Sequence, residues 1–99
     1  MGRIDVRPDE LDRMAVSLSG TAEDMQATSG RVDHVKQCVE EGWQSNYTAA
    51  YIEGLDVLKR NLQLLAESTR ELSDMVRQTA ADIRRVEEEN RVQLGGGGR

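Results

Sequence analysis

The sequence predicts an all-α protein that folds as a hairpin of two long antiparallel helices, and three observations lead to this prediction. Apolar residues recur at alternating spacings of three and four along two segments that flank the middle of the chain. The composition combines 31% charged residues with only 3% aromatic residues and a single proline, which is typical of amphipathic helices rather than of a sheet core. The length of 99 residues suits one domain, predicted over residues 1–94.

The first helix is predicted over about residues 8–41. Proline is favoured in the first helical turn, and the Asp9 and Glu10 that follow Pro8 complement the positive end of the helix dipole. Large apolar side chains along this helix predict one stripe that faces a partner helix. The stripe contains Leu11, Met14, Leu18, Met25, Val32, Val35 and Val39.

A turn at about residues 42–45 and a second helix at about residues 46–92 follow. The same periodicity returns in this helix, whose stripe contains Leu55, Leu58, Leu62, Leu65, Leu72, Val76 and Ile83. The helix is expected to end between Asn90 and Leu94, because the four glycines that follow carry a high backbone entropy. Residues 95–99 are therefore predicted to form a flexible tail.

The apolar surface of both helices is wider than the contact within one hairpin requires. Ala15 and Ala22 flank the first stripe, and Ile52 and Ala66 flank the second. A lone hairpin would leave part of this surface in water, so two chains are expected to pair into a four-helix bundle. A homodimer is the expected pairing, and a heterodimer with a similar chain is the alternative.

Composition also excludes several functions. The net charge of −5 argues against a nucleic-acid ligand, which requires a basic surface. The sequence contains no run of eighteen apolar residues, so it predicts no membrane-spanning helix. The N-terminal residues lack the apolar core of a secretory signal. Any export is therefore expected to occur without a cleavable signal peptide. Cys38 is the only cysteine, so no disulfide can form within the chain.

No residue pattern indicates catalysis, a cofactor or a metal. His34 and Cys38 lie four residues apart on one helix, without a third residue to complete a catalytic or metal-binding group. No glycine-rich phosphate-binding loop follows a predicted strand. The sequence therefore predicts a protein that binds other proteins and has no enzyme activity.

The middle of the chain carries a recognisable turn. Trp43, Ser45 and Tyr51 occupy the turn and the start of the second helix, Ile4 and Val6 precede the first helix, and the run Pro8 to Leu11 opens it. With the length and the paired stripes, this pattern resembles the WXG family of small type VII secretion proteins, also called the early secreted antigenic target family. The similarity extends from Ile4 to about Asn90.

Two positions depart from the pattern of the WXG family. Ser45 stands where glycine is usual, although a serine hydroxyl can accept hydrogen bonds from the N–H groups that open a helix. The C-terminal export signal, a tyrosine four residues before an acidic residue, has no match, and Ile83 with Glu87 is the nearest approximation.

The resemblance implies an antiparallel dimer of hairpins that is first cytoplasmic and then exported by a type VII system. It also implies a role as secreted substrate, co-secreted partner or chaperone, with the secretion ATPase or a larger effector as partner. The alternative is a cytosolic coiled-coil adaptor or chaperone of another export system, which would share the helical periodicity but not the turn.

Overall fold

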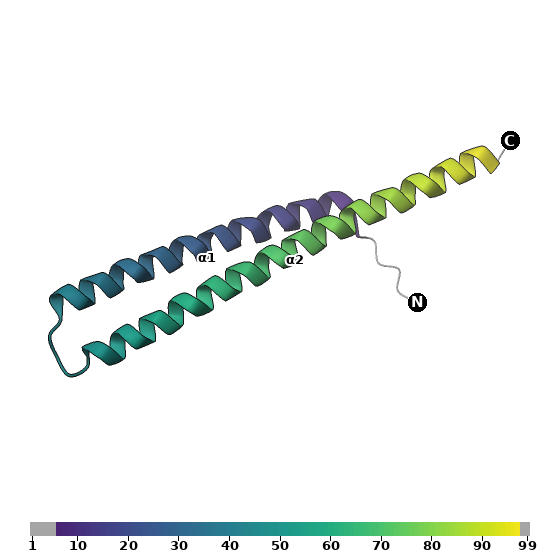
Figure 1. Ribbon diagram of the computed structural model, residues 1–99. Coiled ribbons are helices and arrows are strands. Elements are labelled where there is room, and N and C mark those ends of the chain that lie inside the picture. Colours follow the sequence, from purple (N-terminus) through teal and green to yellow (C-terminus); the bar gives the residue numbers. More distant parts are fainter. Residues whose placement is uncertain (1–5, 98–99) are drawn as a thin grey trace.

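The computed structural model describes residues 6–97, with side chains described as far as Gln93. Within this range the chain forms two helices, α1 (Pro8–Gly42) and α2 (Thr48–Gly97), and no strand. Residues 43–47 form the turn that joins them, and the helices lie antiparallel and side by side (Figure 1). The predicted all-α hairpin is confirmed.

Helix α1 begins at Pro8, as the sequence predicts, and ends at Gly42. Arg7 has extended backbone angles (φ −86°, ψ 134°), so the helical conformation starts with the proline itself. The helix continues without a break through Gly20 and Gly30. At its end, the backbone N–H of Trp43 donates to the carbonyl of Val39 at 3.0 Å, which satisfies one of the last free carbonyls.

Helix α2 differs from its predicted bounds at both ends. It begins at Thr48, two residues later than expected, because Ser45 to Tyr47 belong to the turn. It continues through Gly97, so Gly95 to Gly97 extend the helix instead of starting the predicted flexible tail. Adding a residue to an existing helix fixes only that residue and forms another backbone hydrogen bond, so a long helix can propagate into poor helix formers. Gly98 and Arg99 lie outside the described residues, as does Ile4.

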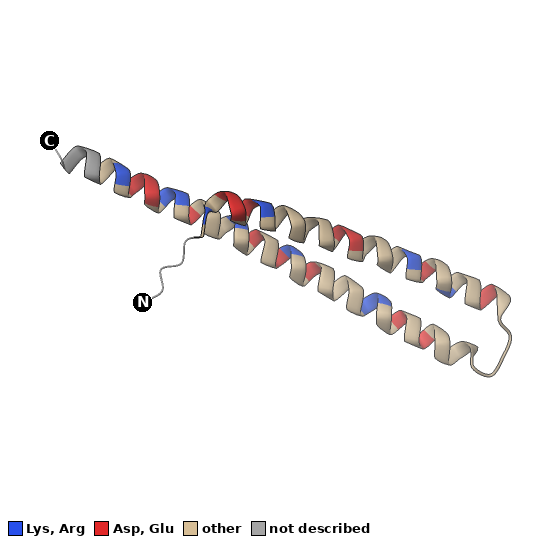
Figure 2. Cartoon of the chain, turned by 180° about the vertical axis from the view of Figure 1, so that it is seen from behind, with Lys and Arg blue, Asp and Glu red and all other residues tan. Residues whose placement is uncertain are grey.

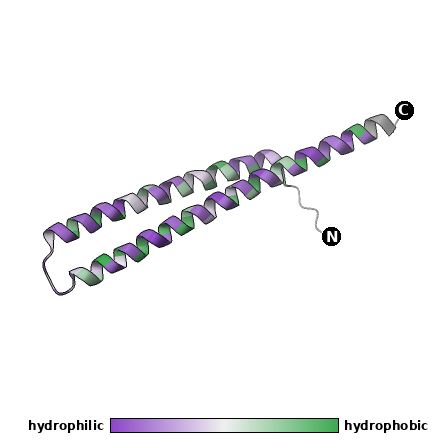
Figure 3. Cartoon of the chain, in the orientation of Figure 1, coloured by the Kyte–Doolittle hydropathy of each residue, from purple (hydrophilic) through white to green (hydrophobic). Residues whose placement is uncertain are grey.

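The C-terminal part of α2 projects beyond the start of α1. Arg84 lies level with the first turn of α1, because its guanidinium contacts the carboxylates of Asp9 at 2.8 Å and Asp12 at 2.7 Å. Residues 85–97 therefore extend alone over about 20 Å at 1.5 Å per residue (Figure 1). We call this segment the extension. Its described side chains, over residues 85–93, are mostly hydrophilic (Figure 3).

Small side chains line the contact between the two helices. The buried positions repeat every seven residues, with Ala15, Ala22 and Ser29 on α1 and Ala66, Ser73 and Ala80 on α2. We call these six residues the seam. Ser73 donates to the carbonyl of Ala15 at 2.8 Å, and the Ser19 hydroxyl lies 2.9 Å from the Ser73 oxygen. Because the single Ser73 proton is used by Ala15, Ser19 is the donor in that pair. These bonds fix the register of the two helices.

On each helix the seam lies one residue later in the sequence than a column of large apolar residues that was predicted to face the partner helix: Met14 precedes Ala15 on α1, and Leu65 precedes Ala66 on α2. Nine residues of the predicted stripes flank the seam and are buried or half-buried: Leu11, Leu18, Met25, Val32, Val39, Leu55, Leu62, Val76 and Ile83. The other five remain exposed in the hairpin: Met14, Val35, Leu58, Leu65 and Leu72. Leu65, 51% exposed, and Leu72, 48% exposed, thus lie on the surface of the single hairpin. Small residues occupy the positions of closest approach because they let the two backbones come near each other.

Candidate functional site

The turn at the tip of the hairpin is held by a reciprocal set of hydrogen bonds. The Ser45 hydroxyl accepts from the backbone N–H of Tyr47 at 3.2 Å, and the Thr48 hydroxyl accepts from the N–H of Ser45 at 3.2 Å. Thr48 Oγ1 also donates to the carbonyl of Trp43 at 3.3 Å. The serine hydroxyl thus bonds the backbone two residues on, and these bonds form a turn that leads into α2 at Thr48. Sequence reasoning identified Ser45 and missed Thr48, although the spacing Ser-x-x-Thr was a signal for it.

The serine at position 45 does not strain this turn. No residue described between 6 and 97 has a positive φ, so the turn uses no conformation that requires glycine. Ser45 also supplies a hydroxyl that glycine lacks. Where the WXG pattern has glycine, the serine therefore adds a side-chain hydrogen bond to the turn.

Trp43 and Tyr51 form an aromatic pair across the turn. Their ring centroids lie 5.0 Å apart with an angle of 86° between the planes, which is the edge-to-face geometry. Trp43 is the first residue after α1 and Tyr51 lies in the first turn of α2, so the pair joins the facing ends of the two helices. Both rings remain half exposed, at 48% and 54%. The tip is therefore both pinned by this pair and open to contact with another molecule.

One side of the hairpin is apolar over most of its length. On this side of the seam, the hydroxyl of Thr69 in α2 lies 3.8 Å from the sulfur of Met25 in α1. Leu65 and Leu72 lie four residues before and three residues after Thr69, and so project from the same side of α2. We call this surface the apolar face. Its exposed members are Met14, Val35, Tyr51, Leu58, Leu65, Leu72 and Val86.

The opposite side of the seam is polar, and ion pairs connect the helices there. Lys36 contacts Asp56 at 2.9 Å, and Lys59 contacts Asp33 at 2.8 Å. Together with the bonds of Arg84 at the other end, they connect the two helices near the tip and near the start of α1. Figure 2 shows acidic and basic residues distributed along both helices and alternating on the extension. We call this side the polar face.

The polar-face contacts also shift two pKa values. The hydrogen bond to Asp56, with the negative charge of its carboxylate, raises the pKa of Lys36 above its ordinary value. The hydrogen bonds to Asp12 and then Asp9 raise the pKa of Arg84 in the same way. Both basic groups are thus held in their charged forms, as an ion pair requires.

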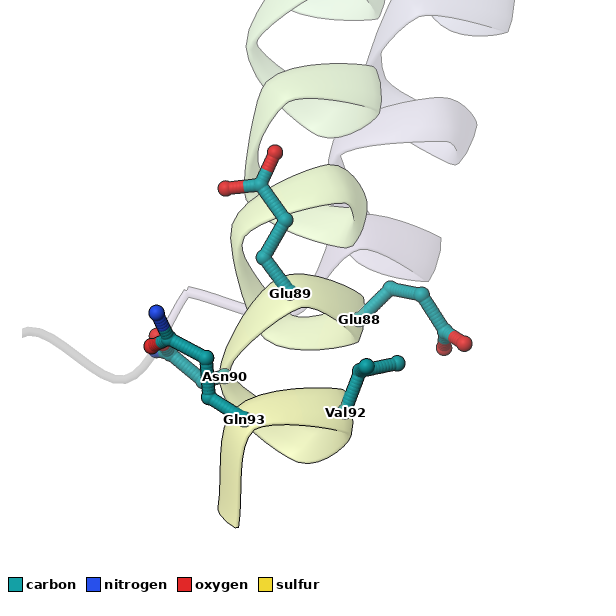
Figure 4. Close-up of a pocket in the computed structure, with 5 residues that line it drawn as sticks. All are labelled: Glu88, Glu89, Asn90, Val92 and Gln93. Carbon is teal, nitrogen blue, oxygen red and sulfur yellow. The ribbon is translucent and has the colours of Figure 1, made fainter. Parts of the chain in front are cut away.

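The residues nearest to an export signal, Ile83 and Glu87, lie where the extension begins. Ile83 is half-buried beside the start of α1, whereas Glu87 is exposed one turn later. Farther along, a hollow is lined by Glu88, Glu89, Asn90, Val92 and Gln93, all from α2 alone. Their side chains point away from the helix in several directions (Figure 4). This part of α2 is an open charged surface.

His34 and Cys38 lie together on α1, but no larger group surrounds them. The Cys38 sulfur is 3.8 Å from His34 Nε2, and both residues are exposed. Within residues 6–97 no group of three or more His, Cys, Asp or Glu side chains could hold a metal ion. Neither described helix contains an apolar stretch that could cross a membrane.

Comparison with known proteins agrees with these features. The model of a family described as a WXG100 like domain matches residues 5–94, which is nearly the whole chain. No match was found among curated proteins or among solved structures. The match includes both helices, the aromatic tip and most of the extension. The chain therefore belongs to the WXG100-like family of small proteins related to type VII secretion.

Proposed function

We propose that this chain is a non-enzymatic type VII secretion protein that acts as a homodimer, either as an exported substrate or as the co-secreted partner or chaperone of a larger effector. The observation that carries this proposal is the apolar face, where large side chains from both helices remain half exposed along the hairpin. Contiguous exposed apolar surface of this kind marks a protein contact. A second hairpin placed on this face completes a four-helix bundle.

The shape of the chain favours an antiparallel arrangement of the two hairpins. Val86 lies two heptads after Leu72, so the apolar face continues onto the extension. A partner that runs in the opposite direction brings its aromatic tip level with the extension, and each overhanging segment then gains a neighbour. In a parallel dimer the two tips meet, and the extensions can contact only each other.

Leu65 and its neighbour Leu64 provide a matched test of the dimer. Fully burying a leucine side chain is worth about 1.5–3 kcal/mol. Leu65 is 51% exposed in the hairpin, so a second hairpin would bury roughly the remaining half of this side chain in each copy. The loss in Leu65→Ala is then about 1.5–3 kcal/mol per dimer, because the residue counts twice, and the Kd should rise roughly 10- to 100-fold.

Leu64→Ala is the control for this measurement. Leu64 is 55% exposed but lies on the side of α2 that faces away from α1, outside the apolar face. Its removal should leave the Kd of the dimer unchanged in sedimentation equilibrium. Equal effects of the two variants would show that the apolar face is not the dimer interface.

Secretion itself is tested in a host with a type VII system. The tagged chain should appear in the culture medium when the secretion ATPase is active and remain in the cells when its ATP-binding site is inactivated. Trp43→Ala should keep the dimer but lose secretion and co-purification with the ATPase or effector, because the exposed indole is the largest apolar group at the tip. Export that continues without the ATPase would favour an adaptor of another system.

A further inference from the structure

A second row of exposed residues begins at Tyr47 in the turn and continues along α2 beside the apolar face. The row consists of Tyr47, Ala50, Gly54, Val57, Asn61 and Leu64, which follow each other at alternating spacings of three and four. We call it the outer stripe. All six residues are exposed in the hairpin. This spacing is the one by which a helix presents a continuous edge to another helix.

The outer stripe lies on the side of α2 opposite to α1. Leu64 precedes the buried Ala66 by two residues, which places the two side chains about 160° apart around the helix at 3.6 residues per turn. Val57 lies nine residues before Ala66 and points in nearly the same direction as Leu64. Helix α1 therefore cannot cover the stripe.

Gly54, in the middle of the stripe, has no role in the packing of the hairpin. A Cβ atom at this position would meet nothing within 4 Å. Glycine inside a helix costs about 1 kcal/mol relative to alanine, so this position weakens α2 without any gain within the chain. Together with Ala50, one turn earlier, it leaves a shallow place on the helix where another backbone can approach closely.

Charges beside the stripe indicate what kind of helix it accepts. Three charged residues lie along one edge of the outer stripe: Glu53, Arg60 and Glu67. Each lies three residues after a stripe residue, namely Ala50, Val57 and Leu64 in turn, and Glu71 follows at the end of the stripe. The three acidic residues outnumber the single arginine, so the edge carries a net charge of −2. A second copy of this chain would bring the same acidic edge against it, whereas a helix with basic residues at its edges would be attracted.

We propose that the outer stripe is the docking site for a single amphipathic helix with basic edges, supplied by another protein. Tyr47 to Leu64 spans about 26 Å at 1.5 Å per residue, which is about five turns of such a helix. The leucine, valine and tyrosine of the stripe contact its apolar side, and its backbone approaches at Gly54. The site faces away from α1 and borders the apolar face, because Tyr47, Gly54 and Asn61 lie four residues before Tyr51, Leu58 and Leu65.

Two synthetic peptides test the proposal. Both have the same leucine and alanine positions over about five turns, and one carries lysine and the other glutamate along its edges. Fluorescence anisotropy with the full chain should show at least tenfold tighter binding of the lysine peptide at low salt. The double variant Val57→Glu/Leu64→Glu should lose that binding at least tenfold, although it adds negative charge. Val16→Glu, an exposed apolar residue of α1, is the control and should bind as the parent does.

Gly54→Gln adds a readout that a purely structural role would not produce. It should raise the urea midpoint of unfolding, because glutamine is a better helix former, and yet weaken peptide binding at least fivefold, because the long side chain fills the place of close approach. Equal binding of both peptides, or unchanged binding by Val57→Glu/Leu64→Glu, would overturn the proposal. A change in the oligomeric mass of that variant would also overturn it, since the stripe would then be an interface between copies.

Discussion

Replacing Ala22 by leucine tests the seam, the feature that sets how closely α1 and α2 approach. Ala22 is 0% exposed and lies near the middle of the paired region. A leucine there adds three carbon atoms at a point where the two backbones lie close together, so the helices must move apart or the side chain must take an unfavourable rotamer. Overpacking of this kind costs about 1–3 kcal/mol per site. In a chain of about 100 residues that loss lowers the Tm by roughly 5–20 °C.

Ala27→Leu is the matched control, because Ala27 lies on the same helix and is exposed. Its effect on stability should stay within about 0.5 kcal/mol, which is usual for surface positions. Circular dichroism at 222 nm during heating and during urea unfolding measures both variants at one fixed protein concentration. If Ala22→Leu unfolds together with the parent and with Ala27→Leu, small residues do not form the contact between the helices.

Three further predictions concern the tip, the polar face and the cysteine. Ser45→Ala should lower stability by about 1 kcal/mol, measured by urea unfolding, because it removes the hydroxyl that accepts from the N–H of Tyr47. The pKa of Lys36 is raised in the folded state, so its ion pair contributes to stability below the ordinary lysine pKa of about 10.4. This contribution is lost as the pH rises further. The Tm difference between the parent and Lys36→Met should therefore shrink above about pH 10.5. Mild oxidation should not cross-link an antiparallel dimer through Cys38. The two thiols would lie toward opposite ends of such a dimer, and a disulfide needs Cα atoms within about 7 Å. Rapid, complete cross-linking would indicate a parallel dimer.

Local signals in the sequence were sufficient to predict the hairpin and one of its boundaries. Pro8 followed by two acidic residues marks the start of α1, and the structure begins the helix at that residue. The tryptophan beside Gly42 marks the turn, and the edge-to-face contact of Trp43 with Tyr51 gives the physical reason for an aromatic residue there. These features depend on residues close together in sequence, which is why sequence patterns reveal them.

The register of the core could not be predicted in the same way. Along α2, the spacing of three and four is satisfied by the column of Leu65 and Leu72 and equally by the column of Ala66 and Ser73 one residue later. Large side chains give the stronger hydrophobic signal, so the pattern favours the leucines. Close approach of two backbones selects the small residues instead, and the leucines are left at the surface. Only the three-dimensional structure separates the contact within one hairpin from the surface available to a second one.

The C-terminal bound of α2 was also beyond the sequence signals. Four glycines predict the end of a helix when each residue is judged by its own propensity. In the structure, Gly95 to Gly97 continue a helix of 50 residues, where cooperativity along the helix outweighs that propensity. Thr48 illustrates the opposite case, since its hydrogen bonds to Ser45 and Trp43 in the turn were encoded locally and were nevertheless missed.

The mass of the purified chain in solution tests most directly whether the apolar face is a dimer interface. Sedimentation equilibrium of the chain alone, over a range of micromolar concentrations, should give twice the chain mass of 11.1 kDa, with circular dichroism dominated by helix. The sedimentation coefficient should be low for that mass, because each chain is an extended hairpin of 82 × 26 × 14 Å. A helical chain that remains at 11.1 kDa throughout this range would contradict the homodimer on which the proposed function rests.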